Sequence, residues 1–303
     1  MPPASYLGEI AALLSSICFS IGPTFNTLAG QRVSNGTVNR VRLSLTLVLL
    51  VIPHWLIEGA PFPMDGQADH WIFMGLSGLF SLVIGDSLLF AAFITIGTRL
   101  TMLISCLMPV FSSLLARVLL NESLNGLQVV GILVTISGVA WVMLDPNNDS
   151  IGIKDRKAFL RGSLIALAAA FFHAAGAIAA KRGMGDGFPA LSAHMIRTCA
   201  GLFLILLPLL LPRRAGLAVQ ELRRRPEALK YLFWGAIFGP LLGMWLSLYS
   251  IQNANVGIAT SLSSLSPIWL LPVGRFFFHE KIGGRAVLGS LVAVIGAAII
   301  FIY

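Results

Sequence analysis

Charged residues are scarce in this sequence. Only 11% of its 303 residues are Asp, Glu, Lys or Arg, whereas a soluble globular protein averages about 25%. Hydrophobic residues make up 56% of the chain, and the mean hydropathy is +0.85. A charge deficit along the whole length argues against a soluble globular protein. It indicates a helical protein that crosses a membrane several times.

The signatures of several functional classes are also missing. Nothing resembles a P-loop, which argues against an ATP-driven pump within this chain, and we find no zinc site, Ser/His/Asp order or nucleic-acid-binding module. The three cysteines, Cys18, Cys106 and Cys199, all lie in apolar runs, where we expect inert core residues rather than a disulfide or metal site. The N-terminus lacks the basic region of a cleavable signal peptide. We therefore expect no cofactor, no metal and no nucleic-acid partner.

Long apolar runs fill most of the chain. Most of them hold the roughly 20 residues needed to cross about 30 Å of hydrocarbon. The predicted spans are 7–29, 37–57, 71–94, 98–120, 124–144, 160–181, 188–212, 230–251, 255–278 and 284–303. The polar stretch Asp145–Lys157 separates the first five spans from the last five. We expect a first repeat over residues 1–144, a polar linker over 145–158 and a second repeat over 159–303.

One segment occurs twice. SCLMPVFSSLLARVLLNESLNGLQVVGILVTISGVA (Ser105–Ala140) aligns without a gap to Ser263–Ala298 at an offset of 158 residues. The identical pairs include Pro109 and Pro267, Glu122 and Glu280, Gly131 and Gly289, and Gly138 and Gly296. An odd number of spans in each half makes the halves face opposite ways across the bilayer, a plan typical of secondary transporters. The predicted fold is an all-α integral membrane protein with ten transmembrane helices in two inverted five-helix repeats.

This repeated Pro…Glu…Gly…Gly pattern resembles the EamA family of the drug/metabolite transporter superfamily. The resemblance covers essentially the whole chain. It implies ten helices around a central cavity, with the fifth and tenth helices packed at the rear. It also implies a small-molecule substrate such as an amino acid, another metabolite or a drug.

Basic residues predict the orientation. Lysine and arginine gather in the loops after the odd-numbered spans, as in Arg156, Lys157 and the run Arg213–Lys230, whereas the opposite side holds few of them. The positive-inside rule then places both termini outside the cytoplasm. We expect a multi-pass protein of the cell (inner or plasma) membrane, present in the bilayer as a monomer or homodimer.

Asp86 is the most informative single residue. A carboxylate within a span costs about 2.5–3.5 kcal/mol on insertion scales, so such residues usually face a cavity and usually function. Its candidate roles are binding a substrate ammonium group and exchanging a proton. The alternative is an Asp that is hydrogen-bonded to a Ser or Thr of another helix, or one near the interface.

Two arginines occupy equivalent points of the two halves. Asn39 and Arg42 correspond to His194 and Arg197. Each arginine either snorkels to the headgroups or pairs with another helix, or else forms a carboxylate or phosphate clamp. His173, in FFHAAGA, is either a hydrogen-bonded core residue or a proton relay. Asn26 is a further polar candidate in the first span.

Other candidates concern helix shape and aromatic surface. Trp245, Tyr249 and Gln252 share a helix face and form either a pocket wall for an organic substrate or lipid-facing aromatics.

The prolines of the repeat, Pro109 and Pro267, predict helix breaks that act either as hinges or as fixed kinks. Glu122 and Glu280 are expected at turns between paired helices, either as surface or capping carboxylates or, if buried, in proton coupling. The spacing Gly235-x-x-x-Gly239-x-x-x-Gly243 predicts close helix contact.

The leading hypothesis is a secondary transporter of small organic metabolites that works by alternating access, with export as the favoured direction and protons coupled through Asp86. One alternative is a membrane-embedded enzyme that uses Asp86, His173 or His194. Another is a membrane receptor or scaffold that carries no flux. We expect no enzymatic activity, because these residues form no known motif at catalytic spacing.

Overall fold

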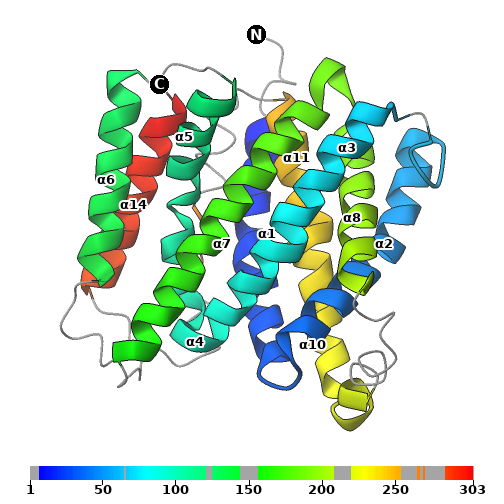
Figure 1. Ribbon diagram of the computed structural model, residues 1–303, viewed down its shortest axis with the longest axis horizontal. Coiled ribbons are helices and arrows are strands. Elements are labelled where there is room, and N and C mark those ends of the chain that lie inside the picture. Colours follow the sequence, from blue (N-terminus) through cyan, green and yellow to red (C-terminus); the bar gives the residue numbers. More distant parts are fainter. Residues whose placement is uncertain are drawn as a thin grey trace.

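The computed structural model describes residues 7–64, 66–120, 125–143, 156–207, 220–253, 265–266, 269 and 284–302. Within these ranges the regular structure is helical and contains no strand. The first half comprises α1 (Leu7–Gly30), α2 (Asn35–Glu58), α3 (Ala68–Ser77), η2 (Gly78–Gly85), α4 (Asp86–Ser105), α5 (Met108–Leu120) and α6 (Gly126–Met143). The second half comprises α7 (Arg156–Gly183), η4 (Gly185–Gly187), α8 (Ala190–Leu206), α10 (Glu227–Ala236), η6 (Ile237–Met244), α11 (Trp245–Asn253) and α14 (Gly284–Ile302). Figure 1 shows them as one bundle.

Among the described residues, six helices are long and apolar enough to cross a membrane. They are Ile10–Gly30, Asn35–Glu58, Ala68–Thr98, Leu100–Leu119, Arg156–Gly183 and Glu227–Ser250. Three shorter apolar helices, Val129–Trp141, Ala190–Leu206 and Val287–Gly296, lie where the sequence predicts further spans. The span expected at 255–278 lies outside the described residues, apart from residues 265, 266 and 269. The protein is therefore a multi-pass membrane protein.

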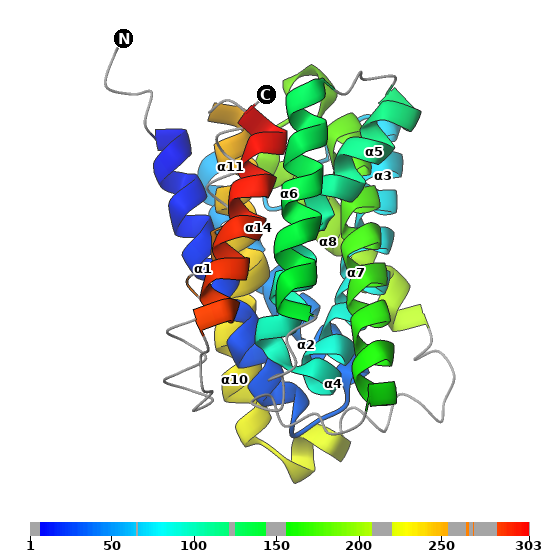
Figure 2. The same ribbon diagram turned by 90° about the vertical axis from the view of Figure 1, so that its left-hand side faces the viewer.

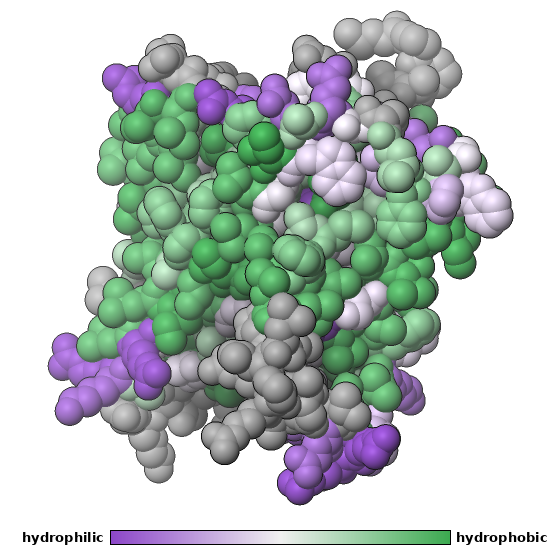
Figure 3. Space-filling view, turned by 45° about the vertical axis from the view of Figure 1, so that its right-hand side comes forward, coloured by the Kyte–Doolittle hydropathy of each residue, from purple (hydrophilic) through white to green (hydrophobic). Residues whose placement is uncertain are grey.

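The outer surface fits a bilayer. Figure 3 shows an apolar band between two polar ends of the molecule. Large apolar side chains point outward along several helices, with Leu56 78%, Leu164 66% and Phe203 66% exposed. Exposed apolar surface on this scale is stable only where lipid covers it.

Gly97 sets the boundary between the third and fourth spans. The helix labelled α4 contains a sharp kink at this residue, whose φ is 80° and ψ is 160°. Glycine adopts this conformation readily, whereas a side chain would be strained. The boundary agrees with the sequence, which predicts that one span ends near residue 94 and the next begins at 98.

The two halves run in opposite directions. In Figures 1 and 2, α1 begins at the end of the bundle where its equivalent α7 finishes. The start of α1 and the end of α14 lie at the same end of the bundle (Figure 1). This arrangement agrees with the predicted inverted repeat.

The helices α6 and α14 pair at one edge of the bundle (Figure 1). Glycines allow the backbones to approach closely, because a Cβ built on Gly138 would lie 2.5 Å from the Ala293 backbone nitrogen. A Cβ on Gly296 would likewise collide with Thr135. These helices hold the fifth and tenth predicted spans, so their pairing agrees with what the family resemblance implies.

A second close contact joins α1 to the stretch formed by α10, η6 and α11. A Cβ on Gly22 would lie only 2.7 Å from the Gly239 Cα, and one on Gly235 would collide with Asn26. The predicted structural role of the stripe Gly235-x-x-x-Gly239-x-x-x-Gly243 is thus confirmed. This contact fixes helices of the two halves against each other near the middle of the bundle.

Candidate functional site

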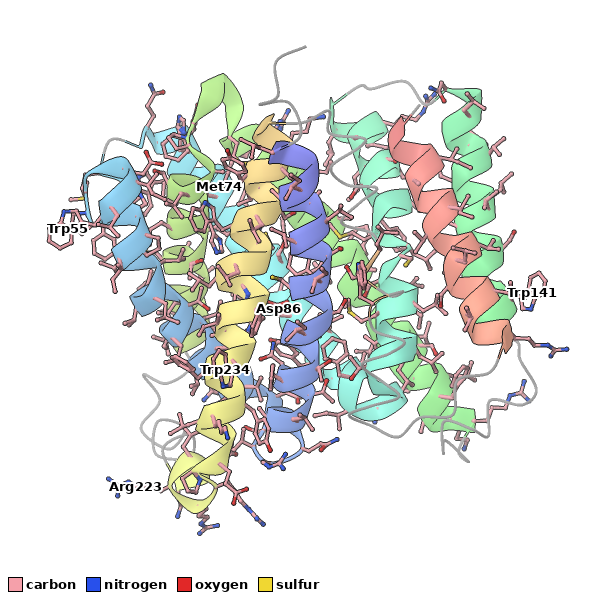
Figure 4. All side chains as sticks on the ribbon, turned by 180° about the vertical axis from the view of Figure 1, so that it is seen from behind. Trp55, Met74, Asp86, Trp141, Arg223 and Trp234 are labelled. Atoms are coloured by element: carbon pink, nitrogen blue, oxygen red, sulfur yellow. The ribbon has the colours of Figure 1, made fainter. Side chains whose placement is uncertain are left out.

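A cluster of polar side chains lies inside the bundle. It comprises Asn39 and Arg42 of α2, Asp86 at the start of α4, His173 of α7, and His194 and Arg197 of α8. Figure 4 shows Asp86 near the middle of the molecule, whereas Trp55 and Trp141 lie on its outer sides. Sequence reasoning named all six residues, but it could not show that they meet.

Arg42 and Asp86 form an ion pair in the cluster. Only 6% of the arginine side chain and 12% of the aspartate side chain are exposed. Arg42 also donates a hydrogen bond to the Asn39 Oδ1, at 3.0 Å, and its guanidinium lies 5.0 Å from the centroid of the Phe90 ring. Of the alternatives for Arg42, the structure therefore places it in a pair with another helix rather than at the headgroups.

His173 approaches the same carboxylate from the other half of the chain. Its Nε2 lies 3.3 Å from the Asp86 Oδ1, and 20% of its side chain is exposed. The neighbouring Gly85 provides the space, because a Cβ there would collide with the imidazole ring. Asp86 consequently links α2 of the first half to α7 of the second half.

Arg197 has a different environment from Arg42. It is 5% exposed, and its NH1 donates to the thioether sulfur of Met244 at 3.6 Å. Its buried Nε has no hydrogen-bond partner in the described part of the chain, which is also true of the Arg42 Nε. Arg197 still lies close enough to Asp86 and Arg42 to interact with both charges.

His194 fastens α8 to η6. Its Nε2 lies 2.8 Å from the carbonyl oxygen of Pro240, and the residue is fully buried. A carbonyl oxygen only accepts hydrogen bonds, so Nε2 carries the proton and donates it. The buried Nδ1 has no partner among the residues that the structure describes.

These contacts follow one pattern in both halves. The Asn39 Nδ2 donates a hydrogen bond to the Leu82 carbonyl oxygen at 2.7 Å. In the second half, the His194 Nε2 donates in the same way to the Pro240 carbonyl oxygen. Leu82 and Pro240 differ by 158 positions, the offset of the repeated segment. The same offset takes Asp86, the partner of Arg42, to Met244, the partner of Arg197. Met244 therefore occupies in the second half the place that Asp86 occupies in the first.

Sequence reasoning missed Met244. The repeat offset of 158 aligns Met244 with Asp86, but a methionine in an apolar span does not by itself indicate a functional residue. Both contacts with backbone carbonyls also lie in π-helical segments, η2 and η6, at equivalent places of the two halves. Such segments are frequent at functional sites.

The remaining polar candidate on α1 lies apart from the ion pair. Asn26 is 4% exposed, and its Oδ1 has no hydrogen-bond partner within the described ranges. It faces Gly235 of α10. The structure records no hydrogen bond from Asn26 to Arg42 or Asp86 among the described residues.

The aromatic candidates have different surroundings. Trp245 packs in a core cluster with Leu50, Leu191 and Met195. Tyr249 is 37% exposed, and the side chain of Gln252 lies outside the described part of the molecule. The pocket wall of Trp245, Tyr249 and Gln252 therefore stays a prediction.

The candidates of the repeated motif are only partly described. Pro109 is the second residue of α5, and a turn at Cys106 and Leu107 interrupts the helix just before it. Glu122, Pro267 and Glu280 lie outside the described residues. Within the described ranges, no group of three or more His, Cys, Asp or Glu side chains is placed to hold a metal ion.

His54 was also missed by sequence reasoning. Its Nδ1 lies 2.6 Å from the Ala60 carbonyl oxygen and its Nε2 lies 3.1 Å from the Ser192 Oγ. The residue is 1% exposed and ties α2 to α8 away from the ion pair. Its two fixed contacts indicate a structural role.

Comparisons with known proteins agree with this architecture. The model of the EamA-like transporter family matches residues 6–144 and 160–302. A solved structure described only as "Crystal structure of protein" has a TM-score of 0.62 to this chain at 17% identity, covering 98% of this chain and 95% of the other. That likeness shows a shared fold. A search of curated proteins found no match. The chain belongs to the EamA-like transporter family and is a multi-pass membrane transporter of the drug/metabolite transporter type.

Proposed function

We propose that this transporter is a secondary transporter of small organic metabolites and that it works by alternating access. Its ten helices form two inverted repeats, residues 1–144 and 159–303, joined by the linker 145–158. The observation that carries the proposal is the contact of Asp86 with Arg42 of the first half and His173 of the second. Because the Asp86 carboxylate contacts both halves, its contacts change when the halves move relative to each other.

Alternating access would exchange these contacts. If the halves rock against each other around a fixed site, the distance from His173 to Asp86 changes while Arg42 and Asp86 stay within one half. The π-helical segment η2 ends directly before Asp86, the partner of Arg42, and η6 ends at Met244, the partner of Arg197. Irregular helix geometry therefore lies beside both arginines. These segments are our candidates for the points of bending.

Proton coupling belongs to the same proposal. A carboxylate with an imidazole at 3.3 Å, inside a membrane-spanning bundle, offers two groups that can exchange a proton. The other charged or titratable groups around Asp86 are Arg42, Arg197 and His194. Protonation of Asp86 would cancel its attraction to Arg42 and loosen the link between α2 and α4.

The orientation follows from the basic residues. Arg32 and Arg225 line one surface pocket, and Lys157 and Arg161 line another, of about 430 Å³, which they share with Asn35 at the start of α2. We propose that this end faces the cytoplasm and that both termini lie outside it. The protein would act in the cell membrane, as a monomer or homodimer, with export as its direction.

A flux measurement tests the function. The purified protein is reconstituted in proteoliposomes and screened with amino acids, organic acids, amines and uncharged metabolites, with and without a pH gradient. We expect flux of at least one class above that of protein-free liposomes. Absence of flux for every class, from protein verified as folded, would contradict the function.

The coupling has a separate readout. Asp86→Asn should abolish pH-driven accumulation while the protein remains inserted, and Asp86→Glu, which keeps the carboxylate, should retain part of it. Accumulation at the wild-type level in Asp86→Asn would remove Asp86 from the coupling and leave transport itself standing.

A further inference from the structure

Among the residues that the structure describes, Arg197 of the second half forms no ion pair with a carboxylate. Arg42 and Arg197 are equivalent in the two halves, and each is 5% exposed. Arg42 pairs with the Asp86 carboxylate, whereas Arg197 has the Met244 thioether at the equivalent place. Sulfur in a thioether is a weak hydrogen-bond acceptor and carries no charge. Burial of a guanidinium is costly unless a paired charge offsets it.

The other described groups near Arg197 do not supply that charge. Asp86 already accepts from Arg42 and lies beside His173. His194 donates through Nε2 to the Pro240 carbonyl and adds no negative charge. Two guanidiniums therefore share a single carboxylate, and with neutral histidines the set of Arg42, Asp86 and Arg197 has a net charge of +1.

We propose that Arg197 binds the carboxylate of the transported substrate, at the place beside η6 that corresponds to the Asp86 carboxylate beside η2. This inference rests on the proposed function and names its substrate class: a small organic monoanion with one carboxylate. A guanidinium matches a carboxylate with two parallel N–H···O bonds. One carboxylate brings the set of charges to zero, whereas a phosphate dianion would leave it negative.

The location distinguishes the substrate from lipid. Asp86 lies near the middle of the bundle in Figure 4, away from the polar ends seen in Figure 3. A phospholipid headgroup resides at those ends. The anion bound by Arg197 is therefore a free carboxylate that reaches the site during transport, displacing the Met244 sulfur from the guanidinium.

Acetate is the direct probe, because it is a free small molecule with the same carboxylate group as an aspartate side chain. Thermal unfolding of the full-length protein in detergent is measured with sodium acetate, with acetamide and with sodium chloride at equal ionic strength. We expect acetate to raise the Tm of the wild type and acetamide to leave it at the chloride value, since a ligand that binds only the folded state stabilises it. Arg197→Gln should weaken the acetate response by about tenfold or more in apparent affinity.

Substitution of Met244 provides the reciprocal test. Met244→Asp builds the missing carboxylate into the chain, so it should have a higher Tm than Met244→Asn, which has the same shape without the charge. The Asp variant should also lose the acetate response, and the Asn variant should still respond. This pair keeps the test interpretable even if Arg197→Gln does not fold.

Three results would overturn the inference: an equal response to acetate and acetamide, an acetate response that survives Arg197→Gln, or a lower Tm for Met244→Asp than for Met244→Asn. The flux screen separates this inference from the proposed function. Flux of amines or uncharged metabolites without any acetate response would refute the anion site and leave transport intact. An acetate response without flux of any class would refute transport and leave the anion site standing.

Discussion

Arg42 and Asp86 are an ion pair between helices α2 and α4, with 6% and 12% of their side chains exposed. Removing one partner of such a pair leaves an unpaired charge in the interior, whereas replacing both by apolar side chains removes both desolvation costs. The pair is therefore expected to matter more for function than for stability. Single and double substitutions distinguish these two contributions.

The first prediction concerns this pair. Asp86→Leu should lower the free energy of unfolding by about 3–5 kcal/mol, because Arg42 is left buried and unpaired. The double variant Arg42→Leu, Asp86→Leu should recover part of that loss, because Arg197 also loses the carboxylate with which it interacts, while transport stays abolished. Unfolding is followed by thermal denaturation in detergent, and flux is followed in proteoliposomes. Additive losses in the double variant would show that the two side chains do not act as a pair.

The second prediction concerns the room that Gly85 leaves for His173. Gly85→Ala should push the imidazole away from Asp86 and lower the free energy of unfolding by about 1–3 kcal/mol. His173→Ala in the same chain should restore most of that stability, because the obstructing ring is gone. Thermal denaturation of the single and double variants measures the recovery. If the double variant is as unstable as Gly85→Ala, the clash is with the Phe80 carbonyl oxygen, 3.0 Å from the added Cβ, and not with His173.

Hydropathy and the repeat predicted the helices and their order. The boundary at Gly97 and the close approach of α1 at Gly22 both follow from local chemistry, since glycine adopts a positive φ readily and has no side chain that would collide with the Gly239 backbone. Asp86 and Arg42 were recognised as unusual because a charge within a span is costly.

The partners of these residues could not be predicted. Arg42 and Asp86 are 44 positions apart on different helices, and their meeting depends on how each helix is rotated in the bundle. The π-helical segments η2 and η6 lie directly before Asp86 and up to Met244, and their sequences read as ordinary apolar helix. The contacts of Leu82 and Pro240 set the register between η2 and η6 at 158 positions, the offset of the repeated segment.

The third prediction uses the contact between Gly22 and Gly239, which is asymmetric. A Cβ on Gly22 would lie 2.7 Å from the Gly239 Cα, but a Cβ on Gly239 would have no neighbour nearer than 3.9 Å. Gly22→Ala should therefore force α1 and η6 apart and cost about 1–3 kcal/mol. Gly239→Ala should be neutral or stabilising by up to about 1 kcal/mol, since alanine favours a helix over glycine. Comparable losses of Tm in both variants would contradict the close backbone contact.

The last prediction concerns pH and a contact at the basic end of the molecule. The Glu221 Oε2 accepts hydrogen bonds from the Ser34 backbone N–H at 3.0 Å and from the Ser34 Oγ at 2.9 Å. Partial burial acts to raise the pKa of Glu221, but the hydrogen bonds from Ser34 and Thr37 and the charge of Arg40 hold it below its usual value. The ionised carboxylate thus binds the start of α2.

The sign of the pH effect follows from that lowered pKa. The contact contributes fully above the usual glutamate pKa of about 4.3 and is lost as the pH falls through the lower value in the folded protein. Hydrogen exchange at Ser34, corrected for its intrinsic rate, should therefore speed up as the pH is lowered below about 4. Glu221→Gln keeps an acceptor oxygen but cannot titrate, so its corrected exchange rate at Ser34 should not change with pH in this range. Glu227→Gln is the matched control, because the Glu227 side chain is 81% exposed and lies 3.9 Å from Arg32, its ion-pair partner among the described residues, so it should behave as the wild type. An equal response in both variants would assign the pH effect to the general charge of this surface rather than to the Glu221 contact.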